Sequence, residues 1–146
     1  ASERSVLQYG SPTSGNELVS SPPEGLPSIR TIAMPADANP NGDIFGGWLM
    51  AQMDLAGGTY AFGISRGRVT TVAVDAMTFH LPVQVGDQVS CYCTTEKIGN
   101  TSIAVKVETW VRRRHDQGEE RVTEGLFTFV AIDAAGRPRP VKRTAS

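Results

Sequence analysis

Hydrophobic residues follow two kinds of repeat along the chain, one helical and several strand-like. Within residues 46–64 they recur at helical spacing, which predicts one helix with a single apolar stripe. That stripe consists of Leu49, Met53, Ala56 and Tyr60. Runs rich in β-branched or alternating residues predict strands at 28–34, 69–80, 88–98, 101–114 and 121–133. We expect strand 69–80 to be largely buried on at least one face.

The order of these elements is strand, helix and then four strands. One long apolar helix with mostly antiparallel strands predicts the α+β class, in which the helix buries its stripe on the sheet. Gly57 and Gly58 weaken the middle of the helix by about 1 kcal/mol each relative to alanine. Such a pair is tolerated where another group packs very close to the helix.

The 146 residues suit a single domain, which we place at residues 27–136. Residues 1–26 are rich in Ser, Pro, Gly and Glu, which is typical of a flexible tail. Residues 137–146 form a basic, proline-containing C-terminal tail.

Charge and cysteine content narrow the class of protein. The net charge of −1 gives no bias toward nucleic acid or a membrane surface, and no apolar run approaches the roughly 20 residues of a membrane span. The N-terminus lacks the pattern of an export signal. Cys91 and Cys93 point to the same face of a predicted strand and are poorly placed to form a disulfide, which favours a cytoplasmic protein. His80 and His115 stand alone, so we expect no metal site.

The turn-rich segment 39–48 leads directly into the predicted helix, and most of the candidate catalytic residues lie in or near it. Asp43 precedes a helix N-terminus, where unpaired N–H groups favour an anion, and Gly46 and Gly47 allow close approach to the backbone. Asp54 lies eleven residues after Asp43, about 16 Å along a helix, so both carboxylates of one chain cannot reach one reacting carbon. If both act on one substrate, they come from two subunits related by a two-fold axis. Asp43 has the alternative role of a helix N-cap, and Asp54 that of a buried, hydrogen-bonded residue.

The chain resembles hotdog-fold acyl-CoA thioesterases, most closely the bacterial YciA-like group, over residues 29–140. The resemblance rests on several motifs in a fixed order. They are Ala33-Met34-Pro35-Ala36-Asp37, Asn41-Gly42-Asp43-Ile44-Phe45-Gly46-Gly47-Trp48, Gln52-Met53-Asp54, Gly67-Arg68-Val69-Thr70-Thr71-Val72, Met77-Thr78-Phe79, Val85-Gly86-Asp87 and Glu124-Gly125-Leu126-Phe127.

This resemblance implies a hotdog fold, in which a curved antiparallel sheet of about five strands wraps a long central helix. It implies hydrolysis of acyl-CoA to free acid and CoA at a dimer interface, without metal or cofactor. It also implies self-association to a dimer and further to a hexamer. In that family an acid at the position of Asp43 usually serves as base or nucleophile, and one at the position of Asp54 serves in other hotdog branches.

Thioester hydrolysis needs a group that activates water or attacks directly, and donors for the developing oxyanion. Asp43 or Asp54 supplies the first, and Asn39 is a candidate to orient water or the carbonyl. The backbone N–H groups of Gly46 and Gly47 are candidates for the oxyanion site.

The substrate-binding candidates each have a structural alternative. By resemblance Thr101 and Ser102 lie near the CoA chain, although such residues are usual in a hairpin. Arg68 and Arg112 are either solvated or bound to CoA phosphates. Phe79 belongs to the core or to the acyl pocket.

Two other functions fit the same sequence. A hotdog dehydratase of acyl thioesters usually uses a histidine paired with an acid, and segment 39–48 contains no histidine. A non-catalytic acyl-CoA binding or regulatory protein is also possible on this fold, because a fold does not fix a function.

Overall fold

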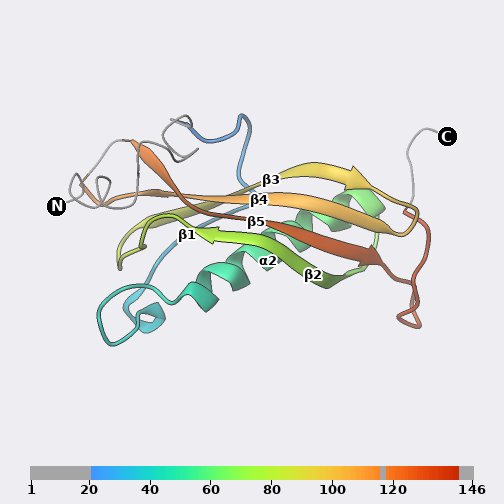
Figure 1. The fold of residues 1–146 in the computed structure, drawn as a ribbon, viewed down its shortest axis with the longest axis horizontal. Helices are drawn as coiled ribbons and strands as arrows, with labels where there is room; N and C mark the ends of the chain where they lie inside the picture. Colours follow the sequence, from blue (N-terminus) through green and yellow to red (C-terminus); the bar gives the residue numbers. More distant parts are fainter. Residues whose placement is uncertain (1–20, 116–117, 142–146) are drawn as a thin grey trace.

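A computed structural model describes residues 21–115 and 118–141 of the chain. One helix lies against one face of a curved antiparallel sheet (Figure 1). The elements are β1 (Ile29–Ile32), a short 3-10 helix (Pro35–Asp37), α2 (Gly46–Ser65), β2 (Val69–Phe79), β3 (Gln88–Ile98), β4 (Ser102–Arg112) and β5 (Glu119–Ala131). The predicted α+β hotdog architecture is confirmed.

The sheet has the strand order β1-β3-β4-β5-β2, with every pair antiparallel. The predicted helix is confirmed to within one residue, and the predicted bounds of β3 are those observed. β5 begins two residues earlier than predicted, because Glu119 and Glu120 pair with the end of β4. The short 3-10 helix lies between the predicted first strand and the turn-rich segment 39–48, where no helix was predicted.

The main core lies between α2 and the centre of the sheet. Leu49, Met53 and Ala56 of the predicted stripe are buried, and the Tyr60 hydroxyl lies 2.8 Å from Thr95 Oγ1. The close approach expected at the glycine pair is present, because a Cβ built on Gly57 would lie only 2.9 Å from the Phe129 ring. Any side chain at position 57 would therefore require the Phe129 ring or the helix to shift.

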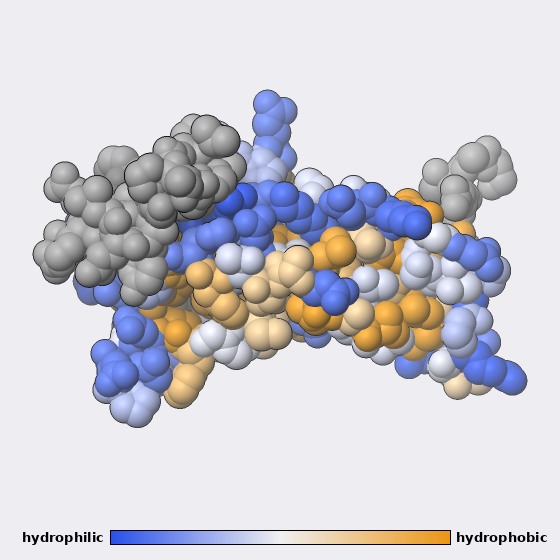
Figure 2. All heavy atoms as spheres, viewed as in Figure 1, coloured by the Kyte–Doolittle hydropathy of each residue, from blue (hydrophilic) through white to orange (hydrophobic). Residues whose placement is uncertain are grey.

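The expectation that β2 is largely buried is wrong for the isolated chain. β2 is an edge strand, and its side chains Val72 and Val74 are 55% and 38% exposed. The exposed face of α2 adds Leu55 and Phe62, so apolar residues gather where β2 and α2 meet (Figure 2). Apolar residues on an edge strand become buried only when another element packs over them. The sequence pattern is the same whether that element belongs to the same chain or to another one.

At each end of the sheet, polar contacts in partly buried surroundings link segments that are distant in sequence. The Asp87 carboxylate accepts a hydrogen bond from Arg113, which also reaches Glu120 at 3.2 Å. At the other end Arg139 donates to the Ser65 carbonyl at 3.2 Å, and Val141 is buried in the core. Packing onto the core thus extends through 137–141, inside the segment assigned to a tail.

The remaining residues of the two predicted tails, 1–20 and 142–146, lie outside the described part. In that described part, no helix is both long and apolar enough to cross a membrane.

Candidate active site

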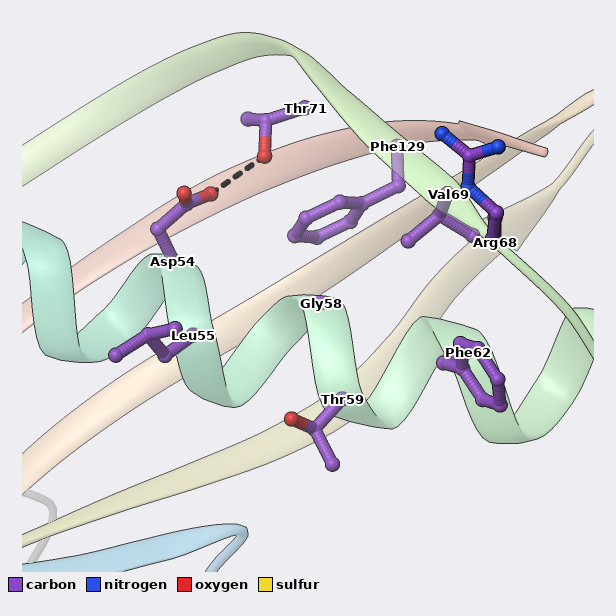
Figure 3. Close-up of a pocket in the computed structure, with 9 residues that line it drawn as sticks. All are labelled: Asp54, Leu55, Gly58, Thr59, Phe62, Arg68, Val69, Thr71 and Phe129. Atoms are coloured by element: carbon purple, nitrogen blue, oxygen red, sulfur yellow. Dashed lines mark hydrogen bonds between the residues drawn. The ribbon is translucent and has the colours of Figure 1, made fainter. Parts of the chain in front are cut away.

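An open pocket of about 440 Å³ lies between α2 and the start of β2 (Figure 3). Its lining combines one carboxylate and one guanidinium with mainly apolar groups. The lining residues are Asp54, Leu55, Gly58, Thr59, Phe62, Arg68, Val69, Thr71 and Phe129. This volume is within the range of small-molecule sites, and the pocket opens on the apolar face that β2 and α2 share.

Asp54 and Thr71 meet at one end of this pocket. Thr71 Oγ1 donates a hydrogen bond of 2.6 Å to Asp54 Oδ1 (Figure 3). Thr71 pairs with Phe129 across β2 and β5, and paired residues of neighbouring strands share one face, so its side chain points toward the helix. This hydrogen bond restrains the carboxylate, and among residues 21–115 and 118–141 its other oxygen, Oδ2, has no hydrogen-bond donor.

Asp43 belongs to a loop that Asn39 holds closed. Asn39 Oδ1 accepts hydrogen bonds from the N–H groups of Asn41 at 2.9 Å and Asp43 at 3.1 Å. The alternative of a helix N-cap is wrong for Asp43, because Phe45 occupies the cap position and no side chain caps the helix. Asp43 is half-buried and does not line the pocket, so the structure brings only one of the two candidate acids into it.

Gly46 and Gly47 present backbone donors at the start of α2. Within the described part of the chain, their N–H groups have no hydrogen-bond acceptor. Both glycines are exposed, and the Phe79 ring lies over Gly46. The helix rise places these donors about 11 Å from Asp54 in the same chain, too far for both to contact one thioester. Within one chain, the structure therefore does not bring these donors and Asp54 to the same reacting carbon.

The predicted substrate-binding residues are distributed over the two ends of the sheet. Arg68 lines the pocket, and Thr101 and Ser102 lie near the same end of the sheet but outside the lining. Arg112 lies at the opposite end of β4, roughly 33 Å from Ser102 along the strand, where it faces Glu119 at 3.8 Å. The structure therefore does not bring Arg112 to this pocket within one chain.

Three residues that line the pocket were not among the predicted site residues: Phe62, Thr71 and Phe129. Thr71 belongs to one of the motifs on which the resemblance rests, but as a threonine in a predicted strand, where threonine is common, it was not a candidate for a role in the site. His80 does not stand alone, since its Nε2 lies 2.8 Å from Glu124 Oε2. Across the described ranges, no three His, Cys, Asp or Glu side chains cluster in a way that would hold a metal ion.

In sequence and fold, the chain is similar to known thioesterases. Residues 41–116 match the thioesterase superfamily. The acyl-CoA thioester hydrolase YciA of Salmonella typhimurium is 52% identical over 122 residues, 82% of this chain and 92% of that protein. Its counterpart in Escherichia coli K12 is 50% identical over 80% of this chain and 91% of that protein.

Solved structures give the same result. A hexameric thioesterase from Yersinia pestis superimposes with a TM-score of 0.79 at 53% identity, covering 83% of this chain and 98% of that one. An acyl-CoA hydrolase from Staphylococcus aureus, in complex with coenzyme A, has a TM-score of 0.75 at 25% identity, covering 79% and 69%.

The Staphylococcus aureus enzyme has been solved with an asparagine, an aspartate or a threonine replaced by alanine. Those three residues are separated by fifteen and seventeen positions. Asn39, Asp54 and Thr71 have the same two separations in this chain.

Proposed function

This chain belongs to the thioesterase superfamily with the hotdog fold, and from that premise we propose that it hydrolyses acyl-CoA thioesters to a free acid and coenzyme A. The observation that carries this proposal is the Asp54 carboxylate, held by Thr71 at the end of an otherwise mainly apolar pocket. The named relatives at about half identity act on the same class of substrate. A cytoplasmic location is part of the proposal, supported by the two free cysteines.

Asp54 is the group proposed to act on the thioester carbonyl, by one of two routes. In the first, its carboxylate displaces the CoA thiolate to form an acyl–aspartyl anhydride, and water then hydrolyses that anhydride to the free acid and restores Asp54. In the second, Asp54 takes a proton from a water molecule that attacks the carbonyl carbon, the C–S bond breaks as the tetrahedral intermediate collapses, and the proton passes on to the departing thiolate or to solvent. The Thr71 hydrogen bond to Oδ1 restrains the carboxylate, and Oδ2 is the oxygen proposed to act on the substrate. The departing group is a thiolate, which leaves readily without a strong general acid. No metal or cofactor enters this scheme.

The oxyanion is proposed to form against the free N–H groups of Gly46 and Gly47 at the positive end of the α2 dipole. Because these donors lie about 11 Å from Asp54 along the helix, a second copy of the chain supplies them. The exposed apolar side chains of β2 and α2 provide the surface for that pairing. A two-fold dimer then carries two equivalent sites, and the hexameric structural neighbours support further assembly.

A dehydratase fits the site less well, because no histidine lines the pocket and His80 is bound to Glu124. A binding protein without turnover remains the other function that the same pocket could serve. Release of free thiol from a panel of acyl-CoAs separates the two, since only a hydrolase releases thiol.

The test compares two variants, Asp54→Asn and Asp43→Asn, assayed with a chelator present because the proposed reaction uses no metal. Asp54→Asn should lower kcat by at least about a hundredfold, the usual contribution of a positioned base, while circular dichroism stays unchanged. Asp43→Asn should retain more activity, because Asp43 lies outside the pocket. A folded, active Asp54→Asn variant would overturn the assignment, and a dead Asp43→Asn beside it would transfer the role to Asp43.

A further inference from the structure

Asn41 and Gly42 form a dipeptide that is chemically unstable in an open chain. Asparagine is a thermolabile residue, because the backbone nitrogen of the next residue can attack its side-chain amide carbon and expel ammonia. A following glycine makes this attack easiest, since it has no side chain to shield the nitrogen. No other Asn or Asp of the sequence precedes a glycine. Asn41 and Gly42 are both exposed in the loop that leads into α2, so water reaches them (Figure 1).

The structure holds this dipeptide in a β-turn that opposes the attack. The Gly42 N–H donates to the Asn39 carbonyl at 2.9 Å, with Pro40 and Asn41 as the central residues. Asn41 is not among the non-glycine residues with positive φ, so the turn is of type I, in which ψ of the second central residue is about 0°. Ring closure needs a rotation of this ψ that swings the Gly42 nitrogen toward the Asn41 side chain. That rotation breaks the Gly42 hydrogen bond, so the attack requires the turn to open.

The Asn39 side chain holds the same turn closed. Its Oδ1 accepts hydrogen bonds from the N–H groups of Asn41 at 2.9 Å and Asp43 at 3.1 Å, and its backbone N–H donates to the Asp43 carbonyl at 2.6 Å. The two side-chain bonds thus tie the residues on either side of Gly42 to one oxygen atom. Asn39 itself is protected from the reaction, because Pro40 follows it and has no N–H.

We propose that Asn41 is a latent deamidation site and that the Asn39 side chain is the clamp that keeps it unreactive. In the reaction, the Gly42 nitrogen bonds to Cγ of Asn41, and the side-chain amide leaves as ammonia with the proton of that nitrogen. Water then opens the five-membered imide, supplying a hydroxyl group to the new carboxyl and a hydrogen to the Gly42 nitrogen. The product is aspartate or isoaspartate, depending on which of the two C–N bonds breaks, and no other reactant is needed.

The isoaspartate product changes the loop that precedes the proposed oxyanion donors. It carries the main chain through Cβ, so the backbone between Asn39 and Asp43 becomes one atom longer and their mutual hydrogen bonds no longer align. Aspartate keeps the backbone length and adds only a negative charge. Gly46 and Gly47 follow this loop closely, so we expect isoaspartate to displace their N–H groups more than aspartate does. This consequence, unlike the modification itself, rests on the proposed hydrolysis.

The experiment incubates the full chain at mildly alkaline pH, both folded and unfolded in urea. Peptide mass spectrometry measures ammonia loss at Asn41, and enzymatic methylation measures isoaspartate. Asn39→Ala removes both side-chain bonds, whereas the matched control Asn39→Asp keeps an acceptor oxygen in place. Each hydrogen bond that has to break lowers the population of the open loop about fivefold. Modification of folded Asn39→Ala should therefore be at least about tenfold faster than that of folded wild type, and Asn39→Asp should remain close to wild type.

Circular dichroism checks that the variants fold. If Asn39→Ala does not, Asn39→Ser replaces it, because its shorter side chain makes weaker bonds and should give an intermediate rate. Equal rates in folded and unfolded wild type would mean that the turn gives no protection. Equal rates in folded wild type and Asn39→Ala, or in Asn39→Ala and Asn39→Asp, would mean that the side-chain acceptor is not the clamp. Each of these results overturns the inference, as does an unfolded chain in which Asn41 stays intact.

Thiol release from an acyl-CoA tests the consequence for the loop. In wild type aged until part of it is modified, activity should fall in proportion to the isoaspartate content, whereas Asn41→Asp, which adds the charge alone, should keep most of its activity. A modified protein that is fully active would overturn this consequence. A fresh wild-type protein that releases no thiol would instead refute the proposed function, and the rates of ammonia loss would still test the clamp.

Discussion

The contact between Gly57 and Phe129 allows a sharp prediction about stability. In the interior of an exposed helix, replacing glycine by alanine stabilises a protein by about 1 kcal/mol, because alanine loses less backbone entropy on folding. At Gly57 the added methyl group would lie 2.9 Å from two Phe129 ring atoms and 3.5 Å from Val107 Cγ2. Carbon atoms normally rest about 3.5–4.0 Å apart, so the ring or the helix has to move.

The magnitude follows from two opposing effects. Overpacking a core by one methyl group costs about 1–3 kcal/mol, whereas the helix gains about 1 kcal/mol from alanine. Gly57→Ala should therefore be neutral or destabilising by up to about 2 kcal/mol. Gly63→Ala has the same helix gain and no clash, so it should stabilise. The two variants should differ by about 1–3 kcal/mol, or roughly 5 °C in Tm for a domain of this size.

Thermal unfolding of both variants at one fixed protein concentration measures this difference, because assembly makes Tm depend on concentration. The variants Gly57→Ala, Phe129→Leu and their combination form a double-mutant cycle that measures the coupling energy between the two positions. If the ring causes the loss, the double-mutant cycle should give a coupling above about 1 kcal/mol. A Gly57→Ala variant that is stabilised as much as Gly63→Ala would refute the packing argument.

Two further predictions concern buried polar groups. Asp87 is 2% exposed and binds Arg113, so Asp87→Asn should lower the free energy of unfolding in urea by about 3 kcal/mol, whereas Arg112→Gln at an exposed pair should lose less than about 1 kcal/mol. Equal losses in the two variants would contradict this. Burial raises the pKa of the Cys91 thiol to about 11, above its ordinary value of 9.0. Because the pKa is higher in the folded state, the contribution of this thiol to the free energy of unfolding is fully present below pH 9 and is lost as the pH rises toward 11. Over that range, the free energy of unfolding of the wild type should fall by on the order of 2–3 kcal/mol relative to that of Cys91→Ala. A constant difference between these two proteins from pH 8 to 11 would contradict the burial of the thiol.

Local patterns of apolar residues predicted most of the helix and the strands. The stripe from Leu49 to Ala56 predicted α2 because a helix that packs on a sheet must repeat its apolar residues every three to four positions. The glycine pair predicted a close approach, but not which glycine makes it, since Phe129 lies more than seventy residues away in sequence. The burial of β2 was mispredicted because apolar residues look alike whether their own chain or another copy covers them.

The site was less accessible to sequence reasoning than the fold. Asp54 was identified as a candidate from its place in a helix of apolar residues, whereas its partner Thr71 lies seventeen residues away on a strand. Nothing in the sequence distinguishes Arg113 from its neighbours Arg112 and Arg114, yet Arg113 forms an ion pair with the buried Asp87. Which of several like residues acquires a partner depends on strand register, and no short motif encodes register over such separations.

The edge strand β2 has a consequence for how assembly ends. Its ladder with β5 is interrupted twice, between Thr71 and Ala73 and between Asp75 and Thr78, and Ala76 adopts a φ of 52° inside the second interruption. A straight, apolar edge would recruit any extended chain and grow without limit into fibrils. A bulged and twisted edge accepts only a partner whose own irregularities match, and a second copy of the same strand meets that condition by symmetry. The two interruptions thus limit pairing at this exposed strand edge to closed oligomers. A substitution that straightened β2 should therefore cause turbidity and fibril growth before it causes a loss of activity.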